Sequence, residues 1–236
     1  MNKEREYIKD EIRKEFQLER MILFSDAVFA IVITLMAIEI KLPEHVDYSS
    51  DTLPYEILKL VPLFIAYAAS FFFIGKTWYE HLRIFSLLKD YDTGLVARNM
   101  FMLFFIGLFP FSVTLVSRPH NTGMLPVFIY FIVIILCSSS QLILQHYILV
   151  KKPHLRISTD IYEPLLRFKK MRAVNIMLVA TFICVLTTRA LIDNPNMKPV
   201  AWIWFMVFPF FLKYFYRRIE KRMKAEKQGE IPGTRD

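Results

Sequence analysis

The chain has 236 residues, of which 55% are hydrophobic and 22 are Phe, and it carries a formal net charge of +8. Apolar runs of this length and density exclude an ordinary soluble domain and indicate an integral membrane protein. The positive charge does not indicate nucleic-acid binding, because the basic residues gather at the ends of apolar segments, as membrane topology requires.

The first 20 residues alternate basic with acidic side chains and end at Arg20. Ile8, Ile12 and Phe16 recur at helical spacing, which predicts a charged amphipathic helix on the cytoplasmic side over 1–20. No short apolar core followed by a small-residue cleavage site precedes the first apolar segment. We therefore expect that segment to be retained as a transmembrane helix.

Six apolar segments are long enough to cross a ~30 Å hydrocarbon core, or nearly so. They cover 21–42, 55–75, 95–117, 124–150, 173–192 and 199–216. The second has prolines and charges in its first turns and is cleanly apolar only over 60–75. The sequence predicts an all-α integral membrane protein with six transmembrane helices over 21–216 and a basic cytoplasmic tail over 217–236.

Basic residues are distributed very unequally between the two sides of these spans. With six spans, one side receives all but five of the 30 Lys and Arg residues, the exceptions being Lys41, Lys59, Arg118, Arg189 and Lys198. Loops rich in Lys and Arg stay in the cytoplasm. This bias places both termini there.

The first span opens with polar residues that are costly in lipid. Asp26 lies about one and a half turns beyond Arg20, and its carboxylate needs a partner there. Other polar side chains occur at the cytoplasmic ends of their own spans, so one layer can hold them all. We predict that these side chains form a structural polar network and not an ion site. Its members are Arg20, Phe24, Ser25, Asp26, Trp78, His81 and Asn99.

Apolar residues of the first span follow one stripe. Ile31, Leu35, Ile38 and Leu42 are spaced by four, three and four residues, so they share a helix face. Asp26 lies ~140° around the helix from Ile31 and would point away from that face. Ordinary helix packing would explain such a stripe equally well from the pattern alone.

The block R-x-x-x-F-S-D over 20–26, followed by F-A-I-x-x-T-L over 29–35, resembles the signature of the transmembrane protein 175 family of lysosomal and bacterial potassium channels. Weaker similarities are W-x-x-H at 78–81, Asn99, and the Pro-Phe pair at 110–111. The resemblance implies a bacterial single-repeat, six-helix member that forms a homotetramer, with the first helix of each subunit lining a central pore.

The resemblance further implies roles for individual residues. Ile31 corresponds to the narrowest constriction, and Thr34 to a threonine linked to selectivity. Thr34 lies ~60° from Ile31 and could reach the lumen edge, or its hydroxyl could simply bond back to the carbonyl of Ala30. Leu35 and Ile38 extend the constriction, and Glu39 and Leu42 are expected at the pore mouth.

A ring of isoleucines offers no oxygen to replace hydration water, so such a neck gates by dewetting. Potassium sheds water more readily than sodium, and we expect modest selectivity for it. Acidic residues between 39 and 59 would concentrate cations at the outer mouth, although an ordinary solvated loop is an equal alternative for all but Glu39.

The alternatives to a channel are a proton-coupled secondary transporter and a membrane-embedded enzyme. A proton-coupled secondary transporter could use Asp26 and His81 as a relay, but the first span lacks the Gly/Pro breaks of many transporter sites. The five histidines are scattered without catalytic or metal spacing, so we expect no enzyme and no bound metal. The expected partners are the lipid bilayer, further copies of the chain and permeating K⁺, with no cofactor and no nucleic acid. The expected location is the bacterial inner membrane.

Overall fold

The computed structural model describes residues 2–38, 58, 61–117, 124–157, 160–192, 200–201 and 203–229. The described chain is all-α, as predicted. Its elements in order are α1 (Asn2–Ile38), α3 (Val61–Phe85), α4 (Thr93–Gly107), α5 (Phe109–Ser117), α6 (Leu125–His146), the π-helical turn η1 (Tyr147–Lys151), the 3-10 turn η2 (Pro153–Leu155), α7 (Tyr162–Leu191) and α8 (Ile203–Gln228).

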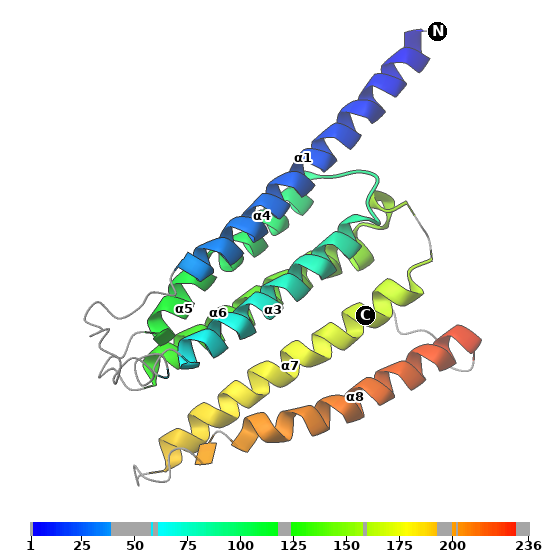
Figure 1. Cartoon of the computed structure of the whole chain (residues 1–236). Coiled ribbons are helices and arrows are strands. Elements are labelled where there is room, and N and C mark those ends of the chain that lie inside the picture. The colour runs from blue at the N-terminus through cyan, green and yellow to red at the C-terminus, as the bar shows by residue number, and fades with distance from the viewer. Residues whose placement is uncertain are drawn as a thin grey trace. The chain divides into compact units, whose positions relative to one another are not determined.

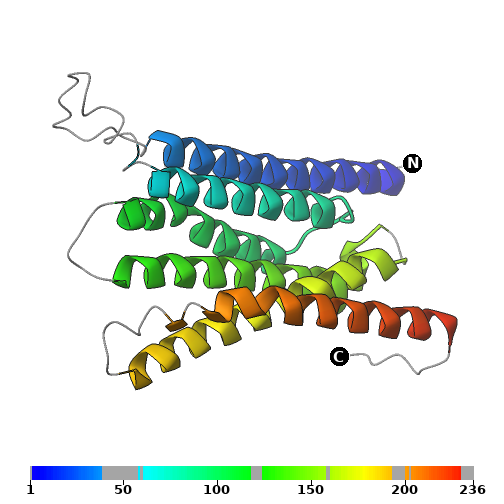
Figure 2. The same cartoon turned by 60° about the horizontal axis from the view of Figure 1, so that its bottom comes forward.

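The helices form two compact units, Met1–Ser158 and Thr159–Asp236. In the first unit α1 packs against α3, α4 and α5, and α6 packs against α3, α4 and α5 (Figures 1 and 2). In the second unit α7 and α8 pack against each other and run in opposite directions (Figure 1). The site predicted on the first span therefore belongs entirely to the first unit.

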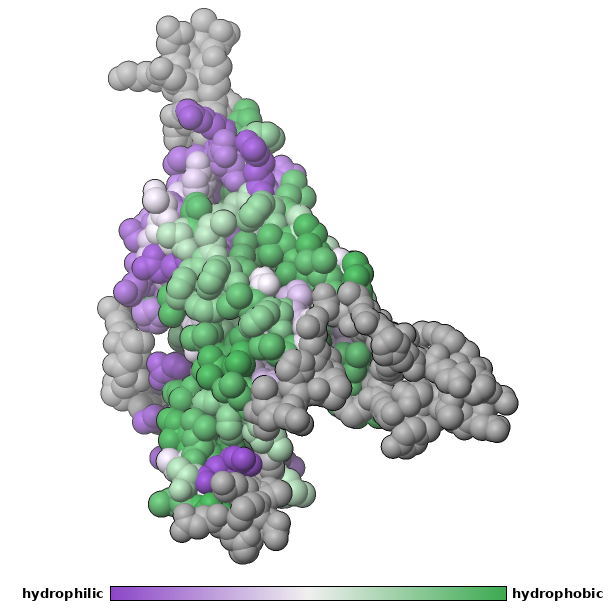
Figure 3. All heavy atoms as spheres, turned by 90° about the vertical axis from the view of Figure 1, so that its left-hand side faces the viewer, coloured by the Kyte–Doolittle hydropathy of each residue, from purple (hydrophilic) through white to green (hydrophobic). Residues whose placement is uncertain are grey.

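Four described helical segments are long and apolar enough to cross a membrane: Glu11–Ile38, Thr93–Val116, Leu125–Lys151 and Tyr162–Leu191. They correspond to the first, third, fourth and fifth predicted spans and make the chain a multi-pass membrane protein. The second and sixth predicted spans include residues outside the described part of the chain. On the face drawn in Figure 3, hydrophilic residues gather toward the upper end and along one edge, and hydrophobic residues form a broad patch over the middle.

Helix α1 runs without interruption through the boundary predicted at residue 20. Its 37 residues contain neither Gly nor Pro, so nothing in the backbone ends a helix there. The amphipathic segment and the first span are consequently one rod. Similarly, α3 continues to Phe85, ten residues past the predicted end at 75, and carries Trp78 and His81 on a rigid element.

The third predicted span is two helices. Helix α4 ends at Gly107, and the Leu108 N–H bonds the carbonyls of Phe105 and Ile106. Helix α5 begins at Phe109, and Pro110 follows as its second residue. Proline supplies no N–H, and its ring crowds the carbonyl four residues earlier, so α4 cannot continue through it. The break is a correction to the single helix expected over 95–117.

The turn between α3 and α4 is tied to the connection that follows α6. Leu88 forms an isolated antiparallel bridge with Arg156, and the Lys89 N–H donates to the Leu155 carbonyl at 2.9 Å. Lys14 on α1 reaches the same turn, with its Nζ 2.9 Å from Asp90 Oδ2. One end of the first unit therefore gathers α1 and two connecting segments.

Asp92 caps α4 at this end. Its carboxylate accepts hydrogen bonds from the Leu95 N–H and from the Tyr147 hydroxyl, each at 2.7 Å, and lies 3.5 Å from Lys152 Nζ. Burial raises the pKa of this carboxyl, but those hydrogen bonds outweigh it and hold the pKa below its ordinary value of 3.8. The ionised Asp92 carboxylate therefore stabilises the start of α4 at pH values above its ordinary pKa of 3.8.

We expect Asp92→Ala to lower the free energy of unfolding by about 1–2 kcal/mol near neutral pH, since a helix cap and a part-buried hydrogen bond from Tyr147 are lost together. A carboxyl with a depressed folded-state pKa stabilises above its unfolded pKa and loses that effect as pH falls through the folded value. Thermal unfolding of both proteins should converge at acid pH. Glu15→Ala, at an exposed position, serves as control. A difference in stability between wild type and Asp92→Ala that persists at pH values where the Asp92 carboxyl is protonated would contradict the role of its charge in the cap.

Candidate functional site

Helix α1 divides into a buried and an exposed face. The buried face carries Ser25, Phe29, Val32 and Met36, each at most 4% exposed, at spacings of four, three and four. These residues face the other helices of the first unit. The spacing follows the helix repeat, so the side chains between them are turned outward.

The predicted stripe lies on that outward face. Ile31 is 56% exposed, Leu35 45% and Ile38 64%. Within the described residues, then, three of the four stripe members are available to contact lipid, a further copy of the chain or an aqueous passage. Leu42 and Glu39 lie outside the described residues.

Thr34 is exposed beside this stripe. Its hydroxyl oxygen lies 3.1 Å from the Ala30 carbonyl and 2.9 Å from the Ile31 carbonyl, to which it donates. The hydroxyl proton is therefore used within the helix, as is common for threonine in membrane spans. The oxygen lone pairs remain, and they are the part of a hydroxyl that a cation would meet.

A buried hydrogen-bond chain fixes the opposite face. Ser25 Oγ donates to the Met21 carbonyl at 2.8 Å, Asn99 Nδ2 donates to Ser25 Oγ at 2.8 Å, and His81 Nε2 lies 2.9 Å from Asn99 Oδ1. Because the Asn99 amide already donates to Ser25, its carbonyl must accept, so His81 carries its proton on Nε2. Three side chains from α1, α3 and α4 form one polar chain, all with 0% exposure.

Aromatic rings enclose the histidine of this chain. The His81 ring stacks on Phe85, with centroids 4.0 Å apart, and Phe29 lies 5.7 Å away on α1. His81 Nδ1 is buried with no hydrogen-bond partner among the described residues. The ring thus contacts an aromatic ring of α3 and lies near one of α1, while its Nε2 is directed toward Asn99.

Asp26 forms a separate pair with Trp78. The Trp78 Nε1–H donates to Asp26 Oδ1 at 2.9 Å, which links α1 to α3 beside the Ser25 chain. Asp26 is half-buried and Trp78 is 39% exposed. The carboxylate thus has a donor from the neighbouring helix, which offsets part of its cost in a membrane.

Two members of the expected network lie elsewhere. Arg20 is exposed, and its guanidinium carbon is 5.8 Å from the centroid of the Phe16 ring, one turn earlier on α1. Phe24 is 50% exposed on the outward face of α1. The structure therefore brings together Ser25, Asn99 and His81, and separately Asp26 and Trp78, without these two.

Two hydrogen bonds join α3 to α6 outside the polar network predicted from the sequence. Ser70 Oγ lies 2.9 Å from the Tyr130 hydroxyl, and Gln141 Nε2 donates to the Thr77 carbonyl at 3.0 Å. Ser70 and Thr77 are seven residues apart, and this spacing could have marked one polar face of α3. These bonds extend the internal anchoring across the unit.

For the tetrameric channel that the resemblance implies, we expect Asp26→Ala to impair assembly more than permeation. The variant removes the hydrogen bond that joins α1 to α3, and a partly exposed bond of this kind contributes about 0.5–1.5 kcal/mol. Trp78→Phe, which keeps the ring and removes only the N–H, should act in the same direction. The assembled fraction is read by size-exclusion chromatography and the K⁺/Na⁺ flux ratio in liposomes. Normally assembled Asp26→Ala protein with altered selectivity would contradict the anchoring role.

The part of the chain that is similar to known proteins includes α1, α3 and α4. Residues 20–110 match the family model described as endosomal/lysosomal potassium channel TMEM175. A potassium channel of Chryseobacterium sp. (strain P1-3) is 31% identical over 130 residues, which are 55% of this chain and 64% of that protein. A potassium channel of Chamaesiphon minutus is 36% identical over 108 residues, which are 46% of this chain and 53% of that protein.

The chain thus spans between about half and two thirds of the length of these curated relatives. The crystal structure of a lysosomal potassium-selective channel TMEM175 homolog from Chamaesiphon minutus has the same fold, with a TM-score of 0.64. That likeness covers 87% of this chain and 99% of the other at 24% identity. The resemblance noted in the first span is confirmed as a similarity: residues 20–110 match the TMEM175 family model, and the fold is that of the TMEM175 homolog.

Proposed function

We propose that the chain forms a homotetrameric cation channel that prefers potassium modestly over sodium, with α1 of each subunit around a central pore. The potassium channels named among its bacterial relatives support this assignment. The observation that carries it is the exposed stripe Ile31, Leu35 and Ile38, which lies opposite a face of α1 that is fixed by buried polar contacts.

The polar chain sets the rotation of α1. If Ser25 and Asn99 stay bonded, the helix cannot turn about its axis without breaking a buried hydrogen bond. The stripe is then presented outward at a defined angle. The same face could meet lipid, but the hydroxyl of Thr34 on it favours contact with a hydrated passage.

The proposed constriction acts through water. A ring of isoleucine side chains supplies no oxygen ligands, so an ion passes with part of its hydration shell or loses water at a cost. Small rotations of α1 would change the ring's width and its wetting. Thr34 oxygens beside the ring would offer weak ligands, which fits modest rather than strict selection of potassium.

We also propose cytoplasmic termini in a bacterial inner membrane. Support comes from the end of the first unit where Lys14 meets Asp90 and Lys152 meets Asp92. It gathers the N-terminal part of α1 and two connecting segments, which belong to the stretches 76–98 and 151–172 with four and seven Lys and Arg residues. The positive-inside rule assigns stretches of this kind to the cytoplasm.

The test is flux from liposomes that contain the purified full chain. A potassium gradient should drive rapid flux that does not saturate over the accessible range, with a smaller response to sodium. Flux that stays equal to that of protein-free liposomes under every cation gradient would exclude a channel.

One observation favours the alternative of a proton-coupled transporter. The break at Leu108 between α4 and α5 is of the kind found at transporter binding sites. Against this alternative, Asp26 is bonded to Trp78 and His81 to Asn99, so the two titratable groups of the supposed relay sit in separate contacts. Saturable potassium flux that is driven by a proton gradient would favour the transporter.

A further inference from the structure

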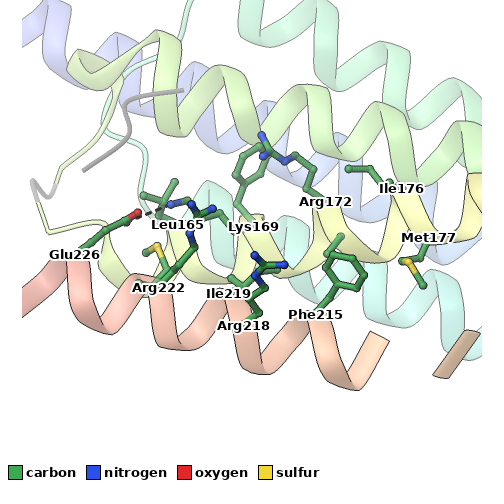
Figure 4. A pocket seen from close by; sticks show the side chains of 13 residues that line it. Leu165, Lys169, Arg172, Ile176, Met177, Phe215, Arg218, Ile219, Arg222 and Glu226 are labelled. Carbon is green, nitrogen blue, oxygen red and sulfur yellow. Dashed lines mark hydrogen bonds and ion pairs between the residues drawn. The ribbon is translucent and has the colours of Figure 1, made fainter. Parts of the chain in front are cut away.

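Helices α7 and α8 enclose a pocket of about 460 Å³ within the second unit (Figure 4). Four cationic side chains line it, Lys169 and Arg172 from α7 and Arg218 and Arg222 from α8, together with one carboxylate, Glu226. None of the residues that line this pocket is among those proposed for the pore.

The pocket changes character along its length. Glu226 and Arg222 lie at one end of the pocket, Lys169, Arg218 and Arg172 lie toward its middle, and Ile176 and Met177 lie at the other end beyond Phe215 (Figure 4). Ile176 is 59% and Phe215 38% exposed, so apolar surface is open there. One end suits an anion and the other suits a hydrocarbon chain.

The carboxylate neutralises only one of the four cations. Lys169 Nζ lies 3.4 Å from Glu226 Oε2. Arg172, Arg218 and Arg222 are exposed, and within the described part of the chain none of them is paired with a carboxylate. Arginine binds phosphate oxygens through paired N–H groups, so three unneutralised guanidiniums favour a phosphate-bearing ligand.

The sequence around the pocket places it at a membrane boundary. Beyond Arg172, α7 has no charged residue until Arg189, and α8 has none between Ile203 and Lys213. The arginines therefore lie where uncharged helix meets charged helix, at the depth of lipid headgroups on the side rich in basic residues.

We infer that this pocket binds an anionic phospholipid, with its phosphate at Arg172, Arg218 and Arg222 and an acyl chain along Ile176, Met177 and Phe215. Free phosphate would satisfy the arginines alone and would leave the apolar end uncovered. A phospholipid matches both ends, and the charges select an anionic headgroup over a zwitterionic one.

Native mass spectrometry of the purified full chain tests this by titration with phosphatidylglycerol, phosphatidylcholine of the same acyl chains, and inorganic phosphate. Phosphatidylglycerol should be retained on the order of tenfold more strongly than phosphatidylcholine. Inorganic phosphate at the same concentration should not displace it, because phosphate lacks the apolar contacts. Equal retention of both lipids, or displacement by phosphate, would overturn the proposal.

Helix α8 offers a matched pair of variants. Arg218→Gln with Arg222→Gln removes two charges from the pocket, whereas Arg217→Gln with Lys221→Gln removes two at the same spacing from residues outside its lining. The first pair should lose on the order of tenfold in phosphatidylglycerol binding and the second less than about twofold. Equal losses would mean that the lipid meets only the general charge of α8, and the pocket would be rejected. Unchanged thermal midpoints without lipid show that both variants are folded.

Discussion

Ile31→Ser should raise potassium flux through the reconstituted channel by about tenfold and bring the K⁺/Na⁺ ratio closer to one. A serine hydroxyl hydrates the neck and lowers the barrier to a partly hydrated ion, and about 1.4 kcal/mol off a barrier corresponds to tenfold in rate. Ile31 is 56% exposed on the outward face of α1, so the substitution costs the isolated subunit little packing. The measurement is flux into liposomes under separate potassium and sodium gradients.

The matched control for this variant is Ile132→Ser on α6. Ile132 is also an exposed isoleucine in a membrane span, at 42%, but it lies on a helix that the account leaves outside the pore. Its flux and ion preference should stay at the wild-type level. If both variants behave alike, or if Ile31→Ser changes neither quantity, α1 does not form the constriction.

Asn99→Ala should lower the free energy of unfolding by about 2–4 kcal/mol, because it removes two buried hydrogen bonds and leaves His81 Nε2 without a partner. The variant removes both the donor to Ser25 Oγ and the acceptor for His81 Nε2. Membrane proteins give smaller values per bond than water-soluble ones, which sets the lower end of this range. Thermal unfolding in detergent should shift downward by on the order of 10 °C.

Thr114→Ala provides the control for that loss. Thr114 is partly buried on α5, and among the described residues its hydroxyl bonds only the carbonyl of Pro110 in its own helix. It ties no two helices together, so its removal should cost much less than that of Asn99. Comparable losses for the two variants would show that the Ser25–Asn99–His81 chain has no special part in holding α1.

The sequence predicts the helical class well because apolar length alone separates membrane helices from loops. The outward position of Ile31, Leu35 and Ile38 follows from the same helical repeat that buries Phe29 and Met36. The bond between Asp26 and Trp78 could be anticipated as well, since a carboxylate in a span needs a donor and few donors occur at that depth.

Other features depend on three-dimensional neighbours that a pattern does not give. Arg20 was expected in the polar network, but its long side chain extends toward Phe16 in its own helix. The pairing of Ser25 with Asn99 depends on how α1 and α4 cross, and no periodicity within either helix reports that angle. The break at Leu108 also does not follow from the sequence pattern, because the apolar run continues through Pro110 without interruption.

Cysteine accessibility along α1 tests directly whether this helix lines a pore. Single cysteines at 31, 35 and 38 of α1, in a protein whose Cys137 and Cys184 are replaced, are exposed in liposomes to a membrane-impermeant thiol reagent while potassium flux is recorded. Modification at these positions should block flux, whereas cysteines at 29, 32 and 36 on the buried face should not react. Full flux after complete modification at 31, 35 and 38 would contradict a pore lined by α1.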